Sequence, residues 1–140
     1  MAAEFRRAIE PDVRSLGRLL GELAEFLVGQ RVAPKAAHDA QLVCDELVAN
    51  AIRHGLGTRS AAAHRIDVTV AVDETLAIEL RDDLPLFDPT AAPPAFRARS
   101  LAEATVGGRG IELVRRAATA FRWRHEEGRN VTEVAIALRP

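Results

Sequence analysis

Two oxygen-bearing side chains are four residues apart in the segment CDELVANAI, residues 44–52. On a helix, Glu46 and Asn50 would lie on the same flank, one turn apart. A carboxylate can accept a hydroxyl proton, and a carboxamide oxygen is a hard ligand for Mg²⁺. Asn50 falls at the edge of the apolar side of this helix, where a solvated Asn is not expected. Taken alone, the pair also fits a solvated Glu beside an Asn that bonds a neighbouring backbone group.

A second candidate lies in the segment LRDDLPLFDP, residues 80–89, where a strand pattern ends at Leu80. Asp82 and Asp83 follow, and one of these carboxylates can point back along the sheet and accept a hydrogen bond from an exocyclic amine such as that of adenine. Two aspartates after a strand are also ordinary turn chemistry. Phe87 is expected to pack beneath the loop that follows. His54, one turn beyond Asn50, is by itself typical of a helix end, where it interacts with terminal carbonyls.

The third candidate is the segment VGGRGIELV, residues 106–114, in which glycines precede an apolar helical pattern. Glycines let the backbone approach a ligand closely, and a helix N-terminus offers unpaired N–H groups to an anion. The glycines at 107, 108 and 110 are therefore a candidate phosphate-binding segment, in which Arg109 could add a charged contact or simply face solvent. The segment lacks the Lys-Ser/Thr of a Walker loop and does not belong to a parallel βαβ unit. The alternative is a flexible loop before an ordinary helix.

An α+β fold is expected to position these segments. Apolar residues spaced by three and four predict helices, and strict alternation predicts strands. The expected elements are a strand at 4–9, a helix from Pro11, a helix from Pro34 to His54 stopped by Gly55 and Gly57, strands at 65–72 and 75–80, an irregular segment at 82–106, a helix after Gly110, and a hairpin with its turn at 127–130. This order indicates a two-layer α/β sandwich with a largely antiparallel sheet and helices on one face. By length, residues 1–140 are expected to form a single domain.

The composition narrows the class of protein. A chain with 48% hydrophobic and 28% charged residues can bury one core. The formal net charge of −1 provides no surplus of Lys and Arg for nucleic acid. Cys44 is the only cysteine, which excludes an internal disulfide and a Cys-based metal site. No segment approaches the roughly 18 apolar residues of a membrane span, so we expect a cytoplasmic protein without membrane contact.

Taken together and in order, the three segments resemble known motifs. ELVANAIRHG, DDLPLFDP and GGRGIELV are similar to the N box, the Asp-containing G1 box and the glycine-rich G2 box of the GHKL ATPases. Within that superfamily the chain resembles the small RsbW-like anti-sigma factor serine/threonine kinases. The resemblance covers nearly the whole chain, from the first strand to the EEGRNVTEV hairpin at residues 126–134. It implies a Bergerat-type fold with ATP and Mg²⁺ as ligands.

The resemblance also implies a role for each candidate residue. Glu46 would be the general base, and Asn50 would be the Mg²⁺ ligand. The other nucleotide contacts would be His54 and Gly55 at the pocket floor, Asp82 at the adenine amine, and Gly108, Arg109 and Gly110 at the phosphates. The implied activity is ATP-dependent phosphorylation of a STAS-type anti-sigma-factor antagonist, together with sequestration of a sigma factor. Dimerisation is left open.

One position departs from the family pattern. Leu84 stands where a glycine is usual, two residues after Asp82, and Pro85-Leu86 replace a region where a second glycine is expected. Leu is bulkier than Gly and less able to adopt a positive φ, so the loop is expected to cover the base differently. This departure favours an alternative function, a nucleotide-responsive module that holds a regulatory partner without phosphorylating it. A third interpretation, the catalytic piece of a sensor histidine kinase, is disfavoured because His54 lies within the ATP motif and no dimerising phosphoacceptor domain is recognised.

Overall fold

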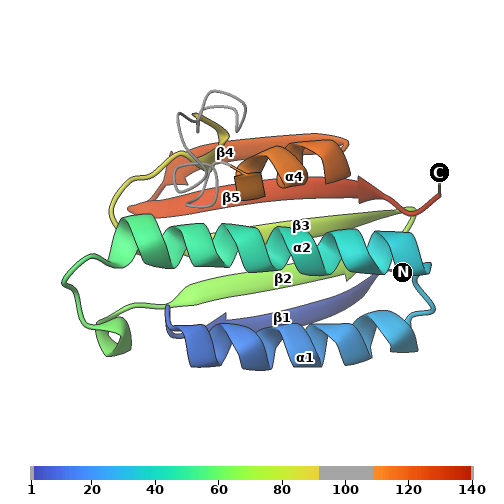
Figure 1. Cartoon of the computed structure of the whole chain (residues 1–140), viewed down its shortest axis with the longest axis horizontal. Coiled ribbons are helices and arrows are strands. Elements are labelled where there is room, and N and C mark those ends of the chain that lie inside the picture. The colour runs from blue at the N-terminus through green and yellow to red at the C-terminus, as the bar shows by residue number, and fades with distance from the viewer. Residues whose placement is uncertain (1, 92–108, 140) are drawn as a thin grey trace.

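The structure is a computed structural model that describes residues 2–91 and 109–139, with Arg109 described by its backbone alone. Its strands form one sheet, and helices cover one face of that sheet (Figure 1). The helices are α1 (Val13–Gly29), α2 (Pro34–Ala51) and α4 (Arg109–Ala117). The strands are β1 (Ala3–Ile9), β2 (Ile66–Val72), β3 (Thr75–Asp82), β4 (Ala120–Glu126) and β5 (Arg129–Ala137). The predicted α+β sandwich is confirmed.

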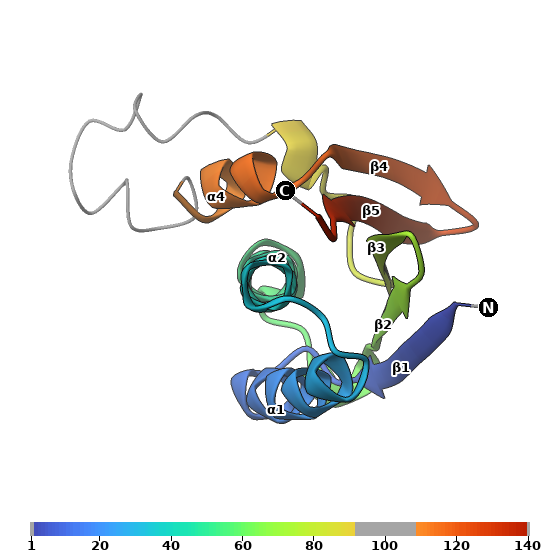
Figure 2. The same ribbon diagram turned by 90° about the vertical axis from the view of Figure 1, so that its right-hand side faces the viewer.

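Every strand pairing in the described sheet is antiparallel, in the order β1-β2-β3-β5-β4. Because β5 inserts between β3 and β4, the end of β3 lies beside the start of β5. Asp82, the last residue of β3, consequently pairs with Asn130 of β5. The sheet curves around α2, with α1 and α4 to either side of that helix (Figure 2).

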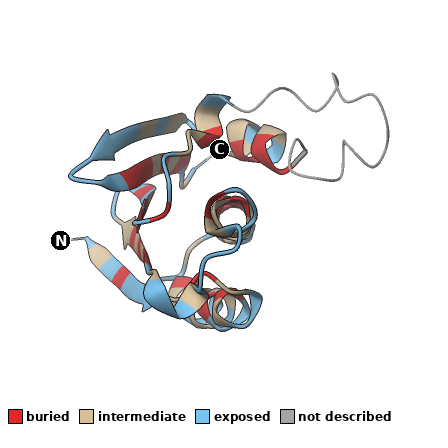
Figure 3. Ribbon diagram, turned by 90° about the vertical axis from the view of Figure 1, so that its left-hand side faces the viewer, coloured by how far each residue is buried: buried red, intermediate tan, exposed pale blue. Residues whose placement is uncertain are grey.

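The core lies between the sheet and the helices (Figure 3). Alternate residues of the strands point into it, as expected for strands with one buried face. The most deeply buried strand side chains include Ile66, Val68, Val70, Leu76 and Ile78, and the helices add Leu19, Leu23, Leu27, Val43 and Val48. None of the described helices is both long enough and apolar enough to cross a bilayer.

The start of the first helix and the end of the second helix differ from the expected positions. The first helix begins at Val13 rather than at Pro11, because the Asp12 side chain caps it by accepting a hydrogen bond from the Ser15 N–H at 2.7 Å. The second helix begins at Pro34 as expected, but Gly55 does not stop it. After Ala51 the chain continues into a π-helical turn, Ile52–Leu56, and turns away only at Gly57, whose φ is +55°.

The last hairpin is tighter than predicted. Its turn consists of Glu127 and Gly128, with φ values of 52° and 76°, and not of residues 127–130. A two-residue turn with both φ values positive matches the twist of paired strands. Arg129 and Asn130 therefore belong to β5, which places Asn130 inside the sheet beside Asp82.

Candidate functional site

The flank of α2 that carries the first candidate pair faces into the molecule. Asn50 is only 2% exposed, and Glu46 is half-buried one turn earlier. The Asn50 Oδ1 atom accepts a hydrogen bond from Arg53 Nη2 at 3.1 Å. An amide oxygen is a type of ligand that a hard metal cation accepts, and the cationic group that this oxygen faces here belongs to the exposed Arg53.

The Glu46 carboxylate lies directly against the first turn of α4. A Cβ atom added to Gly110 would overlap Glu46 Oε2 and would come within 2.5 Å of its Cδ atom. Only a glycine fits at this position while Glu46 keeps its place. The structure thus brings Glu46 and Gly110 together, although they belong to different sequence segments.

Burial changes the proton affinity of Glu46. The pKa of its carboxyl is raised chiefly because burial disfavours the charged form, with a smaller contribution from the neighbouring Asp45 and an opposing one from Arg53. A carboxylate with a raised pKa binds a proton more readily, which is the property a general base requires.

Asp82 and Asp83 have different surroundings, as alternation along a strand predicts. Asp82 is 8% exposed, and its Oδ1 atom accepts hydrogen bonds from the Leu84 N–H and from Asn130 Nδ2, each at 3.0 Å. Asp83 is exposed and binds His64 Nδ1 at 3.0 Å and the Arg65 N–H at 3.2 Å. The inward carboxylate is therefore Asp82, whose pKa is raised mainly by burial, against the hydrogen bonds from Asn130 and Leu84 that lower it.

Asn130 connects β5 to the loop after β3. Its Nδ2 group lies 3.0 Å from Asp82 Oδ1, 3.2 Å from the Leu84 carbonyl oxygen and 3.0 Å from the Pro85 carbonyl oxygen. Its Oδ1 atom accepts hydrogen bonds from the Phe87 N–H at 3.1 Å and from Trp123 Nε1 at 3.2 Å. Sequence reasoning missed this residue because it placed Asn130 in the turn. The available signal was Gly128, which allows a two-residue turn and a longer β5.

Leu84 packs on the π-helical turn that follows α2. It is 3% exposed, and a Cβ atom added to Gly55 would lie 3.0 Å from Leu84 Cβ and 3.1 Å from Leu84 Cδ1. Beside it, the rings of Phe87 and His54 are stacked with their centroids 4.7 Å apart. Burial, with a smaller contribution from Arg53, lowers the pKa of His54, which favours the neutral imidazole.

A small cavity of about 20 Å³ lies beside Asp82 and Leu84. Its described lining includes Asp82, Leu84, Gly55 and Asn130, together with Thr132 of β5. Glu46, Asn50 and His54 are outside this lining. Of the remaining predicted phosphate contacts, Gly108 lies outside the described residues, and Arg109 is placed by its backbone at the start of α4.

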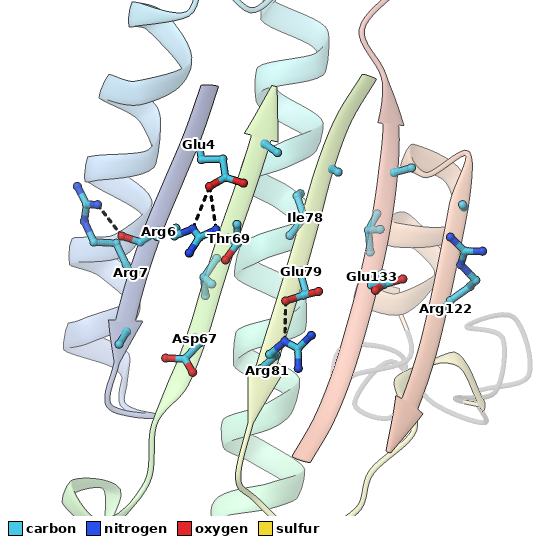
Figure 4. Close-up of a pocket in the computed structure, with 17 residues that line it drawn as sticks. Glu4, Arg6, Arg7, Asp67, Thr69, Ile78, Glu79, Arg81, Arg122 and Glu133 are labelled. Atoms are coloured by element: carbon cyan, nitrogen blue, oxygen red, sulfur yellow. Dashed lines mark hydrogen bonds and ion pairs between the residues drawn. The ribbon is translucent and has the colours of Figure 1, made fainter. Parts of the chain in front are cut away.

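A larger hollow of about 700 Å³ lies on the face of the sheet that no described helix covers (Figure 4). Many of its charged side chains are already paired, as in Arg6–Glu4 at 2.9 Å and Arg81–Glu79 at 2.7 Å. None of the predicted site residues lines it. Among residues 2–91 and 109–139 there is also no group of three or more His, Cys, Asp or Glu side chains that could hold a metal ion.

The contact between Gly55 and Leu84 yields a stability prediction. Gly55→Ala is expected to lower the free energy of unfolding by about 1–3 kcal/mol, because the new methyl group forces Leu84 to move. In a Leu84→Ala background, Gly55→Ala is expected to lower the free energy of unfolding by a smaller amount. The difference between the two backgrounds, which is the coupling energy of the two positions, should be at least about 0.5 kcal/mol. Urea denaturation of the four proteins measures both values. Gly21→Ala, with no atom within 4 Å of the added Cβ, is the control, and equal costs in both backgrounds would contradict the proposed contact.

Comparison with known proteins identifies the family to which the chain belongs. Residues 9–136 match the family model described as the histidine kinase-like ATPase domain. None of the curated proteins compared with the chain matches it significantly. A solved structure of the RsbU and RsbW domains of Rv1364c from Mycobacterium tuberculosis is similar, with a TM-score of 0.69 and 17% identity. The histidine kinase domain of the blue-light-activated histidine kinase EL346 from Erythrobacter litoralis gives a TM-score of 0.55 and 15% identity.

The matches to the two solved structures cover most of this chain but only part of each solved chain. The likeness covers 99% of this chain and 33% of the mycobacterial chain, and 88% of this chain and 61% of the histidine kinase chain. This chain therefore spans less than two thirds of either solved chain, and at such identities the likeness establishes the fold. The family model, in contrast, matches most of the chain. The chain belongs to the histidine kinase-like ATPase domain family, the GHKL ATPases.

Proposed function

We propose that the chain binds ATP with Mg²⁺ and transfers the γ-phosphoryl group to a serine or threonine of a partner protein. The observation that carries this proposal is the contact between the Glu46 carboxylate and Gly110. It joins the helix flank that bears Glu46 and Asn50 to the first turn of α4, and the first backbone N–H groups of a helix have no partner within the helix and can bind an anion. Membership of an ATPase family and the fold shared with an RsbW domain support the same function.

Each residue has a defined task in this proposal. Glu46 accepts the proton of the attacking hydroxyl while the hydroxyl oxygen bonds to the γ-phosphorus and the bond to the leaving ADP oxygen breaks. The first turn of α4, including Gly110, holds the phosphates through its N–H groups. Asp82 accepts a hydrogen bond from the adenine amine, and Asn130 fixes the direction of its carboxylate. His54 and Phe87 border the base.

The donor set fits the expected metal. Asn50 provides a buried amide oxygen, and Mg²⁺ characteristically takes few protein ligands beside phosphate and water. When bound, Mg²⁺ neutralises charge on the phosphates. Asn50 would hold it, in place of the guanidinium of Arg53 that now occupies this oxygen.

The resemblance to RsbW-like kinases supplies the proposed partners. The substrate would be a STAS-type anti-sigma-factor antagonist, and the chain would also sequester a sigma factor in the cytoplasm. Whether a homodimer carries out this task is tested by light scattering of the chain with and without its partner. A pull-down with the chain as bait tests the partners directly.

The ATP site is tested with Asp82→Asn. The substitution replaces one of the two carboxylate oxygens by an NH2 group and removes the negative charge, which weakens the acceptor for the adenine amine, so ATP affinity is expected to fall by about ten- to hundredfold. Calorimetric titration with ATP and Mg²⁺ measures the change. Asp83→Asn, on the exposed neighbour, is the matched control and should bind ATP as the wild type does. Equal affinities for Asp82→Asn and the wild type would remove Asp82 from the adenine site.

The same variant has a stability signature. Because burial raises the pKa of Asp82, the unfolded chain releases this proton at lower pH than the folded chain does. The wild type therefore loses stability as the pH rises from the ordinary carboxyl range through the raised pKa. Asp82→Asn lacks that part of the decline. Thermal unfolding of both proteins across this pH range separates a loss of ATP binding from a loss of folding.

A second function is favoured by the burial of Leu84. The chain would then hold a regulatory partner in response to nucleotide without phosphorylating it. Incubation with radiolabelled ATP, Mg²⁺ and purified STAS-domain proteins distinguishes the two functions. A kinase labels the captured partner, whereas a binding module captures it unlabelled.

A further inference from the structure

Leu84 occupies the part of the site that the proposed function gives to the base. Its side chain is 3% exposed and lies against the backbone of Gly55, at the end of the helix that carries Glu46 and Asn50. Its main chain is held on both sides. The N–H donates to Asp82 Oδ1 at 3.0 Å, and the carbonyl oxygen accepts from Asn130 Nδ2 at 3.2 Å.

The space that remains is too small for a purine. The cavity beside Asp82 measures about 20 Å³, close to the roughly 10–15 Å³ that one water molecule needs. Pockets for small-molecule ligands usually measure about 300–1,000 Å³. Leu84, Asp82 and Gly55 all line this cavity, so the side chain of Leu84 is one of the groups that fill the space.

The neighbouring residues indicate which group can move. Asp82 and Asn130 are fixed in adjacent strands, and Gly55 belongs to the turn that ends α2. Leu84, in contrast, lies just beyond β3 in a loop whose next leucine, Leu86, is 64% exposed. Rotation of the Leu84 side chain would uncover Gly55 and the Asp82 carboxylate while its two main-chain hydrogen bonds and the strand pairings stay in place.

We propose that Leu84 occupies the base subsite of the nucleotide-free chain, and that ATP binds only when the Leu84 side chain leaves it. Leu84 then determines nucleotide affinity, because exposing its buried side chain costs free energy each time ATP binds. A glycine at this position would not carry that cost. This inference rests on the proposed ATP function. It also makes the position of the Leu84 side chain differ between the nucleotide-free and the nucleotide-bound chain.

The test compares Leu84→Gly and Leu84→Ala with the wild type by calorimetric titration with ATP and Mg²⁺. Both variants are expected to bind ATP at least about tenfold more tightly than the wild type. Leu86→Gly is the matched control for Leu84→Gly. It makes the backbone of the same loop equally flexible, but the leucine that it removes is exposed and not buried. Its affinity should equal that of the wild type.

A measurement on the wild type covers the case in which the variants do not fold. In NMR spectra, contacts between the Leu84 methyl groups and the Gly55 α-protons should be present without nucleotide and lost at saturating ATP. Retention of these contacts in the ATP complex would overturn the proposal. Equal ATP affinity of the wild type and Leu84→Ala would overturn it as well while leaving the ATP function intact. If none of the proteins binds ATP at millimolar concentration, the proposed function fails and this inference fails with it.

Discussion

Glu46→Gln is expected to slow phosphoryl transfer by about 10²- to 10⁴-fold, the range that general-base catalysis contributes. The amide cannot accept the hydroxyl proton, but it has nearly the shape of the carboxylate and fits the same space against Gly110. The affinity for ATP should consequently stay within about threefold of the wild type, because only a transition-state interaction is lost. Transfer from radiolabelled ATP to purified STAS-domain proteins measures the rate.

The pH dependence of the rate separates the base from a structural role. Burial raises the pKa of Glu46 above its ordinary value of 4.5, so transfer by the wild type should be full above the raised pKa and should decline as the pH falls through it. Glu46→Gln should lack this decline. Asp45→Asn, which removes a half-buried carboxylate from the same helix turn, should retain it. Transfer by Glu46→Gln at the wild-type rate would exclude Glu46 as the base.

The sequence patterns predicted the layers of this fold correctly because burial repeats with a regular period. Alternation in β2 placed Ile66, Val68 and Val70 on one face, and these side chains are all buried. The three-and-four spacing from Leu16 to Leu27 likewise predicted the buried side of α1. Regular patterns fix which face of an element is inside, and the order of elements then restricts the sheet to a few topologies.

The ends of the elements were predicted less well, because they depend on single hydrogen bonds. The helix α1 begins where Asp12 caps it, and α2 ends in a π-helical turn that runs through Gly55. The strand β3 extends to Asp82 because β5 starts early enough to pair with it. Each of these boundaries depends on a contact between residues that the local pattern does not reveal.

In the candidate site, too, the features that follow from local patterns were predicted, and those that depend on contacts between distant segments were not. Helical spacing placed Asn50 at the edge of the apolar side, and it is almost fully buried. The contact of Glu46 with Gly110 and the hydrogen bonds of Asn130 join segments that are distant in the sequence. The size of the Leu84 side chain was evident from the sequence. Its contact with Gly55 could not be predicted, because that contact depends on the path of the loop.

These long-range contacts have a consequence for function. Leu84 and Asn130 both bind the residue that the resemblance assigns to adenine, so the base end of the site is occupied by the protein itself. Glu46 and Gly110, which the proposed function places at the phosphate end, are in direct contact with each other. Under the proposed function, catalytic rate and nucleotide affinity therefore depend on different residues, and we expect substitutions to alter them separately.

Gly110→Ala is expected to reduce phosphoryl transfer by about 10²-fold, the effect of displacing a reacting group by about 1 Å. The added methyl group overlaps the Glu46 carboxylate, which must swing away from its position. Because that carboxylate is the far end of a flexible side chain, the movement costs little, and Ala is favoured over Gly in a helix by about 0.5–1 kcal/mol. The midpoint of urea unfolding should therefore be unchanged or slightly raised while transfer is lost.

A double-mutant cycle shows whether this loss acts through Glu46. In the Glu46→Gln background, Gly110→Ala should add little, because the group that it displaces no longer accepts a proton. Gly17→Ala provides the control for a helical Gly-to-Ala change, since no atom lies within 4 Å of the added Cβ, and it should leave transfer unaltered. If Gly110→Ala lowers transfer by the same factor in both backgrounds, it acts on the phosphates through the backbone of α4 and not through Glu46. Such a result would separate two residues that the geometry places in one unit.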